Sequence, residues 1–336
     1  MKKISILGAG TWGCALAILL SGNGHEVTIY TKIEKEAKDL EGNRKSLKNL
    51  PGAVLSEDIK ITLNLEEACK DKDIIVMAVA SPYIREISKA ASPYIKKGQI
   101  IVNVSKGIEY GTFYTLSDII NEEIAQADIA VLSGPSHAEE VSRGIPTTIV
   151  VGATTKETAK FIQDVFMNDV FRVYTSPDIV GIELGGSIKN VIALAAGIVD
   201  GLNLGDNTKA ALMTRGIAEI TRLGIKMGAK METFSGLSGI GDLFVTCTSK
   251  HSRNRNAGYL IGQGYSLEET IKKVNQVVEG VNCAKAAFEL SKKYDVEMPI
   301  VEKINEVLFE GKAPIDAVND LLVRDKRKEY STLDWD

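Results

Sequence analysis

The stretch that most constrains the fold of this chain is Gly181–Gly201, which reads GIELGGSIKNVIALAAGIVDG. Its length and composition predict a helix, and apolar side chains leave that helix almost no polar face. A helix that is apolar nearly all round is buried. No neighbouring apolar run is long enough for a membrane, so the sequence predicts burial in a protein core.

Lys189 lies in the middle of this predicted core helix, beside Asn190. An unpaired ammonium is costly to bury, and burial lowers the pKa of a lysine toward the range useful for proton transfer. The alternative is a lysine whose charged end reaches solvent along its own methylene stem. We favour the functional interpretation, because Asn190 adjoins Lys189 and glycines before it clear space.

The composition excludes several classes of protein. The 336 residues are 44% hydrophobic and 25% charged, which is typical of a globular chain with room for two domains. The net charge of -4 predicts no nucleic-acid partner, and no apolar run predicts a transmembrane segment. Four scattered cysteines form no CxxC pair, which argues against a metal site or disulfides and predicts a cytoplasmic location.

The N-terminal segment predicts a dinucleotide-binding turn. A β-type run, Lys3–Leu7, precedes GAGTWG at Gly8–Gly13, and a helical run and a second strand follow. In this context G-x-G-x-x-G is the dinucleotide-binding fingerprint. Gly8 is expected to make the turn, Gly10 to admit the pyrophosphate and Gly13 to let the helix pack on the strand. The alternative is merely a tight strand-to-helix turn.

The end of the second strand, Glu26–Tyr30, bears on the choice of cofactor. NAD sites usually carry an acid there that holds the ribose hydroxyls, whereas this chain has Tyr30, Thr31 and Lys32. Lys32 could pair with a 2′-phosphate, although surface lysines are common and Glu34 is close by. The sequence therefore favours NADP over NAD.

Strands and helices continue to alternate through the first half of the chain. Further β-type runs occupy residues 72–80, 99–104, 128–132, 147–151 and 171–174. This pattern predicts an α/β fold with a Rossmann-type doubly wound sheet. Because ligands bind beyond the carboxyl ends of such strands, Lys106 and the Gly134–Ala138 turn are candidate site residues. Ser136 could also cap the helix that follows, with Glu139 as its partner.

After Gly201 the alternation stops, and helical patterns predict an all-α domain. We therefore expect a dinucleotide-binding domain at residues 1–180 and an all-α substrate and catalytic domain at residues 181–336. The glycine and polar content of two segments predicts that they interrupt the helices. They are Ser235–Cys247, which contains Asp242, and Ser249–Gly258.

The second interruption carries Ser252, Arg253 and Asn254 in succession. A hydroxyl, a guanidinium and an amide together suit a phosphate monoester. The alternative is a solvated basic turn. The three histidines, His25, His137 and His251, are predicted to be bystanders.

Seven motifs run over essentially the whole chain: GAGTWG, VSKG at Val104–Gly107, SGPSHAEEV, ELGGSIKNVIALAAGI, GLSGIGDL, SRNRNAG and VVEGV at Val277–Val281. Together they resemble the bacterial type of NAD(P)-dependent glycerol-3-phosphate dehydrogenase. The resemblance implies reversible reduction of dihydroxyacetone phosphate to sn-glycerol 3-phosphate, a phospholipid precursor. His137 stands where the family often has an aromatic residue.

The resemblance also implies roles for the residues that match the family's motifs. Lys189 matches the proton donor and acceptor. The substrate-contacting positions are matched by Lys106, Gly134, Ser136, Lys189, Asp242, Ser252, Arg253 and Asn254. Besides the fingerprint glycines Gly8, Gly10 and Gly13, the cofactor-contacting positions are matched by Thr11, Trp12, Lys32, Lys106, Ala138, Arg253, Val277 and Glu279.

Two other functions stay open at this stage. A dehydrogenase of the 3-hydroxyacid or 6-phosphogluconate type also joins this nucleotide fold to a helical domain through a lysine-bearing helix, and it would use a carboxylate substrate. A redox-sensing regulator would bind the dinucleotide without turnover and would not need Lys189, Asp242 and Arg253. The sequence does not decide the oligomeric state, for which a homodimer is one alternative.

Overall fold

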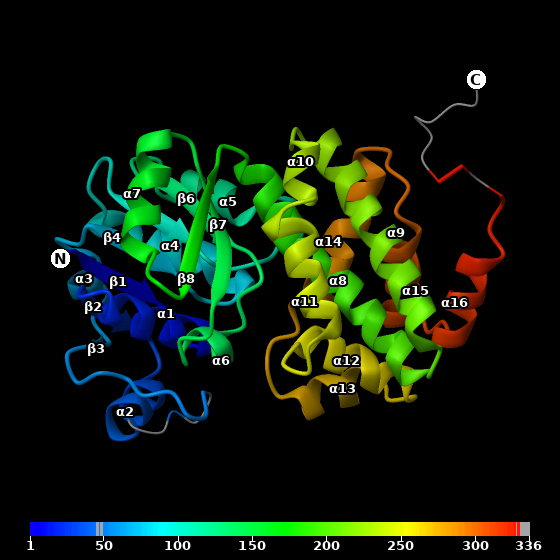
Figure 1. The fold of residues 1–336 in the computed structure, drawn as a ribbon, viewed down its shortest axis with the longest axis horizontal. Helices are drawn as coiled ribbons and strands as arrows, with labels where there is room; N and C mark the ends of the chain where they lie inside the picture. Colours follow the sequence, from blue (N-terminus) through cyan, green and yellow to red (C-terminus); the bar gives the residue numbers. More distant parts are fainter. Residues whose placement is uncertain (45–46, 48–49, 327, 330–336) are drawn as a thin grey trace.

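The computed structural model describes residues 1–44, 47, 50–326 and 328–329. All strands of the described residues lie before residue 177, and the part of the chain that follows is helical (Figure 1). These two parts are called the first and the second half below. The last strand ends at Ser176 and the long helix α8 (Ile179–Gly201) begins three residues later. The domain limits at 180 and 181 stay a prediction, and residues 330–336 of the second domain lie outside the described residues.

A single sheet forms the first half, in the order β3-β2-β1-β4-β5-β6-β7-β8. The strand pairs are parallel except for β6 and β7, which are antiparallel. The strands are β1 (Lys3–Leu7), β2 (Glu26–Tyr30), β3 (Lys60–Thr62), β4 (Ile74–Met77), β5 (Ile100–Asn103), β6 (Asp128–Ser133), β7 (Thr147–Ala153) and β8 (Phe171–Ser176). The predicted Rossmann-type fold class is confirmed.

Helices cover both faces of this sheet because successive strand residues point to opposite sides. On one face Ile4, Ile6 and Val76 pack with α1 (Thr11–Gly22) and α7 (Lys156–Phe166). On the other face strand residues pack with short helices. These helices are α3 (Leu65–Cys69), α4 (Ile84–Ala91) and α5 (Leu116–Glu123). Burial on both faces explains why the central strands are continuous apolar runs. The other short helices of this half are α2 (Glu34–Gly42), α6 (Ala138–Val141), η1 (Ser81–Tyr83) and η2 (Ser92–Tyr94).

The second half packs around α8, as its apolar composition predicts. This helix has the length and hydropathy of a membrane span, but 89% of its apolar window is buried inside the protein. The surrounding elements are α9 (Gly205–Lys226), α10 (Met231–Phe234), η3 (Leu237–Gly241), α11 (Asp242–Thr248), α12 (Arg253–Gly262), α13 (Leu267–Val274), α14 (Glu279–Lys293), α15 (Pro299–Phe309) and α16 (Pro314–Leu322).

The structure corrects the two predicted interruptions of this helical half. The segment Ser235–Cys247 ends in helix α11, and most of Ser249–Gly258 is the start of helix α12. The polar and glycine residues of α12 indicate a loop on propensity alone. Tertiary packing reverses that preference, because Gly258 lets the helix lie directly against α8.

We expect Gly258→Ala to destabilise the fold. A Cβ at residue 258 would overlap the carbonyl oxygen of Leu194 on α8. Overpacking of this kind typically lowers the free energy of unfolding by about 1–3 kcal/mol. Denaturant unfolding checks this against Gly22→Ala, a helical glycine whose added Cβ would meet nothing within 4 Å. Equal stability of the two variants would contradict the close contact of α8 with α12.

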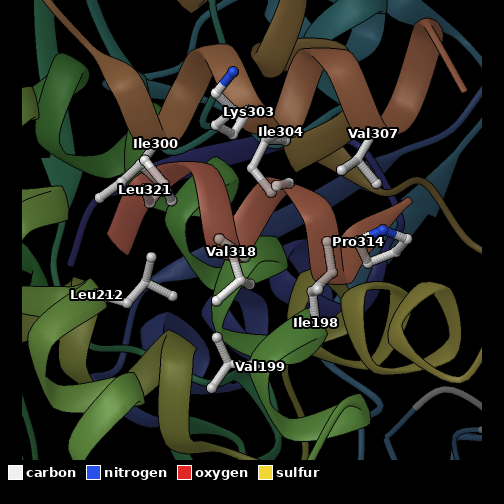
Figure 2. Close-up of a pocket in the computed structure, with 12 residues that line it drawn as sticks. Ile198, Val199, Leu212, Ile300, Lys303, Ile304, Val307, Pro314, Val318 and Leu321 are labelled. Atoms are coloured by element: carbon white, nitrogen blue, oxygen red, sulfur yellow. The ribbon is translucent and has the colours of Figure 1, made fainter. Parts of the chain in front are cut away.

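A small apolar cavity lies between α8, α9, α15 and α16 (Figure 2). Its volume is ≈ 30 Å³, and side chains such as Ile198, Leu212 and Val318 line it. That volume is too small for an organic substrate, and an apolar lining does not hold water well. The functional site must therefore lie elsewhere.

Candidate active site

The buried lysine of α8 has two partners on α11. The Nζ of Lys189 lies 2.7 Å from Oδ1 of Asp242 and donates to Oγ1 of Thr246 at 2.5 Å. Thr246 donates its own hydroxyl proton to the backbone carbonyl of Asp242, so its oxygen accepts from the lysine. Lys189 is only 5% exposed, so its charged end does not reach solvent in this structure.

A second lysine reaches the same carboxylate from the other half of the chain. The Nζ of Lys106, in the segment after β5, lies 2.6 Å from Oδ2 of Asp242 and 3.4 Å from the carbonyl oxygen of Gly134. The hydroxyl of Ser187 on α8 bonds both the N–H and the carbonyl of Gly107, which holds this segment beside the helix. One carboxylate thus joins two ammonium groups, which leaves a net positive charge.

Burial and charge set the protonation of this cluster. Burial lowers the pKa of Lys189 to about 8. The attraction of Asp242 opposes this shift, and the positive charge of Lys106 adds to it. Burial alone would raise the pKa of Asp242, but Lys106 and Lys189 together hold it below its usual value. The carboxylate is therefore ionised near neutral pH, whereas the Lys189 amine can exchange its proton.

The glycine-rich turn has the geometry of a dinucleotide cradle. Gly8 has φ +127°, and a Cβ there would lie 2.6 Å from the carbonyl oxygen of Ala78. A Cβ on Gly13 would overlap the carbonyl oxygen of Gly8, so the helix packs closely on the turn. Gly10 is the N-cap of α1, without a side-chain cap, and faces open space. Thr11 and Trp12 begin that helix. The turn therefore fits a pyrophosphate at a helix N-terminus.

The tip of β2 carries both signs of charge. Lys32 forms an exposed ion pair with Glu86 at 2.8 Å. Thr31 donates its hydroxyl to Glu36, on α2, at 2.6 Å. The sequence analysis did not identify Glu36 as a candidate, because this residue lies on α2 and not at the end of β2. Glu36 is consequently available for ribose hydroxyls, and Lys32 for a phosphate.

Residues after β4 and β6 border the same edge of the sheet. Glu279, the first residue of α14, accepts hydrogen bonds from Ser81 at its hydroxyl (2.6 Å) and its backbone N–H (3.2 Å). Val277, two residues before Glu279, is exposed.

The turn before α6 carries further predicted residues. Ser136 donates to the carbonyl of Gly134, and His137, not Ser136, is the N-cap of α6. The capping alternative for Ser136 is therefore wrong. Ala138 is buried at the start of α6.

The three predicted phosphate residues have different surroundings. Ser252 is the N-cap of α12 and accepts from the N–H of Arg255 at 3.2 Å. Asn254 is buried and joins Asn190 on α8 to the N–H of Gly280. Arg253 is exposed at the first helical position, with no ion pair among the described residues. The predicted interruption of the helices at Ser252–Asn254 is thus corrected to a helix N-terminus, which is itself suited to an anion.

The sequence analysis missed Thr246, Ser81 and Glu36. Thr246 could have been found, since it lies four residues after Asp242 and one helical turn brings such residues together. Ser81 depends on its contact with Glu279, which lies 198 residues away in the chain. Glu36 is five residues from its partner Thr31, but it lies on α2 and not at the end of the strand. Among the predicted residues, hydrogen bonds join Lys106 to Gly134 and Asp242, Lys189 to Asp242, and Ser136 to Gly134.

A nucleotide cradle on one half and a buried lysine on the other define a dinucleotide-dependent dehydrogenase with two domains. Residues 3–159 match the family described as NAD-dependent glycerol-3-phosphate dehydrogenase N-terminus, and residues 178–319 match the corresponding C-terminus. The chain therefore belongs to the NAD-dependent glycerol-3-phosphate dehydrogenase family, as its motifs predict.

Individual relatives agree with this membership. The chain is 59% identical to glycerol-3-phosphate dehydrogenase [NAD(P)+] of Fusobacterium nucleatum, over 99% of this chain and 100% of the relative. It is 56% identical to the enzyme of the same name from Agathobacter rectalis, over 100% of both. The crystal structure of glycerol-3-phosphate dehydrogenase from Coxiella burnetii superposes with a TM-score of 0.92 at 34% identity, covering 96% of this chain and 99% of that one. The predicted NAD(P)-dependent oxidoreductase is confirmed, and neither alternative function is favoured.

Proposed function

We propose that Lys189 moves the proton in the family's reaction, the reversible NAD(P)H-dependent reduction of dihydroxyacetone phosphate to sn-glycerol 3-phosphate, a phospholipid precursor. The observation that carries this proposal is the buried contact of Lys189 with Asp242 and Thr246. The test follows NADPH and NADH absorbance with dihydroxyacetone phosphate, and with hydroxyacids as controls. Activity with the hydroxyacids alone would contradict dihydroxyacetone phosphate as the substrate.

The chemistry divides between cofactor and protein. A nicotinamide cofactor held by the glycine-rich turn would supply the hydride. In reduction, the ammonium of Lys189 gives a proton to the carbonyl oxygen of the substrate, and in oxidation the neutral amine removes it. Asp242 is a poor proton carrier, because its pKa is lowered and each of its oxygens already faces a lysine. Its role is to hold Lys189 and Lys106 in place.

The phosphate end of the substrate is assigned to the N-terminus of α12. Arg253 offers a guanidinium that has no ion pair within the described part of the chain, and the hydroxyl of Ser252 retains its proton for donation. Lys106, Gly134 and Ser136 are proposed to contact the substrate from the sheet side. Asn254 contributes chiefly by holding α8, α12 and α14 together, because its amide already has partners on two of these elements.

The cofactor is assigned to the cradle formed by Gly8, Gly10 and Gly13. Thr11 and Trp12, at the start of α1, are proposed to contact it, as are Lys32, Lys106, Ala138, Arg253, Val277 and Glu279. Ser81 fixes the carboxylate of Glu279, which supports this assignment. We also propose that the protein is cytoplasmic, consistent with four buried, unpaired cysteines, and keep a homodimer as an alternative for its assembly.

We expect Lys32→Glu to weaken NADPH selectively. The side chain lies at the tip of β2, where a 2′-phosphate would be bound, and its ion pair with Glu86 is exposed and easily exchanged. An acid there would repel the 2′-phosphate and raise the KM for NADPH, while the KM for NADH should change little. An equal rise for both cofactors would remove Lys32 from the 2′-phosphate site.

A further inference from the structure

Two of the three histidines, predicted to be bystanders, face each other beside the candidate active site. His137 is the N-cap of α6 in the sheet half, and His251 lies just before Ser252 in the helical half. Their ring centroids are 5.9 Å apart with planes inclined at 55°. The third histidine, His25, lies elsewhere and contacts the backbone of Lys2 and Val165.

One ring nitrogen of His137, Nε2, has no hydrogen-bond partner among the described residues. This nitrogen is buried. An unsatisfied buried nitrogen is costly unless a ligand completes it. The ring is not isolated from the catalytic cluster: burial first, and then the charges of Lys189 and Lys106, lower its pKa, against the opposing carboxylates of Glu139 and Glu140.

The surrounding charges identify the chemistry of a suitable ligand. Lys106 and Lys189 share the single carboxylate of Asp242, so the cluster keeps a positive excess. Arg253, two residues after His251, begins helix α12, and its guanidinium has no ion pair among the described residues. A dianion with several acceptor oxygens, such as a phosphate group, fits cationic groups, an imidazole N–H and a helix N-terminus together.

We propose that His137 binds the phosphate group of the substrate through Nε2, and that His251 positions the His137 ring from across the two halves of the protein. The inference rests on the proposed function for the identity of the substrate. A bound dianion favours the protonated imidazole, so binding draws a proton from solvent onto His137. His137 is in this account a substrate-binding residue, and His251 is a positioning residue.

The three histidines allow a direct test by NMR. Protein carrying ¹³C-labelled histidine rings should give three ring signals, assigned with the variants His25→Gln, His137→Phe and His251→Gln. Addition of sn-glycerol 3-phosphate, and separately of inorganic phosphate, should shift the His137 and His251 signals and raise the titration midpoint of His137. The His25 signal should not move. An unchanged His137 signal at saturating sn-glycerol 3-phosphate would overturn the proposal.

Steady-state kinetics separate this inference from the proposed function. His137→Phe keeps an aromatic ring but removes both ring nitrogens, so the KM for dihydroxyacetone phosphate should rise about tenfold, with kcat and the KM for NADPH little changed. His137→Gln, which restores an amide donor, should recover part of the loss, and His25→Gln should match the wild type. Wild-type KM in His137→Phe would refute the phosphate contact alone. Absence of dihydroxyacetone phosphate reduction by the wild type would refute the proposed function.

Discussion

Replacement of Lys189 by methionine should lower kcat by about two or more orders of magnitude, the usual contribution of acid-base catalysis. Methionine suits the apolar surroundings of α8, and Asp242 keeps Lys106 as a partner, so no buried carboxylate is orphaned. The fold and cofactor binding should therefore persist. The measurements are kcat for dihydroxyacetone phosphate reduction, circular dichroism, and NADPH binding by fluorescence.

Lys303, which lies outside the candidate site, provides the control for this experiment. Lys303 lies on α15, where it pairs with Glu306 at 2.7 Å beside the apolar cavity. Lys303→Met removes a comparable side chain from a helix of the same domain without touching the candidate site. It should leave kcat near the wild-type value. A folded Lys189→Met enzyme that turns over as fast as Lys303→Met would remove Lys189 from the chemistry.

Replacement of Arg253 by alanine should raise the KM for dihydroxyacetone phosphate by at least about tenfold. Truncation of one partner of a charge-assisted contact that loses water when the dianion binds costs about 2–5 kcal/mol, and 1.4 kcal/mol is a factor of about ten. Arg253 is exposed at the start of α12, so its loss removes no packing contact of the core. The KM for NADPH should rise as well if the guanidinium also contacts the cofactor.

Bare dihydroxyacetone is the internal control for Arg253, because it has the same ketone without the phosphate. The deciding quantity is the ratio of kcat/KM for the phosphorylated and bare ketones. Arg253→Ala should reduce this ratio sharply, since only the phosphorylated ketone loses a contact. An unchanged ratio would mean that the N-terminus of α12 is not the phosphate site, and Lys106 would become the better candidate.

The sequence predicted best those strands and helices that have a glycine or a proline at one end. The end of β1 was predictable from Gly8, which follows it, and the start of β2 from Gly24, which lies shortly before it. A proline at the first helical position marks the starts of α15 and α16. Helix α12 was not predictable, because its Asn and Gly residues are poor helix formers and its stability comes from packing against α8.

The candidate site divides in the same way. The burial of Lys189 was predictable, because a cation in the middle of an apolar helix is itself a local anomaly. Its geometry was not: Asp242 is 53 residues from Lys189 and 136 from Lys106, and only the packing of two domains brings them together. The orphaned nitrogen of His137 was likewise invisible, since an unsatisfied atom is a property of three-dimensional surroundings.

The most direct test of Lys189 as the proton carrier is the pH dependence of single-turnover rates in both directions, in wild type and Lys189→Met. Because the pKa of Lys189 is lowered to about 8, the ammonium predominates below that pH and the amine above it. The rate of ketone reduction should fall as the pH rises through about 8, while the rate of alcohol oxidation should rise. Both dependences should vanish in Lys189→Met. Profiles that run in the same direction, or that survive the substitution, would contradict the assignment.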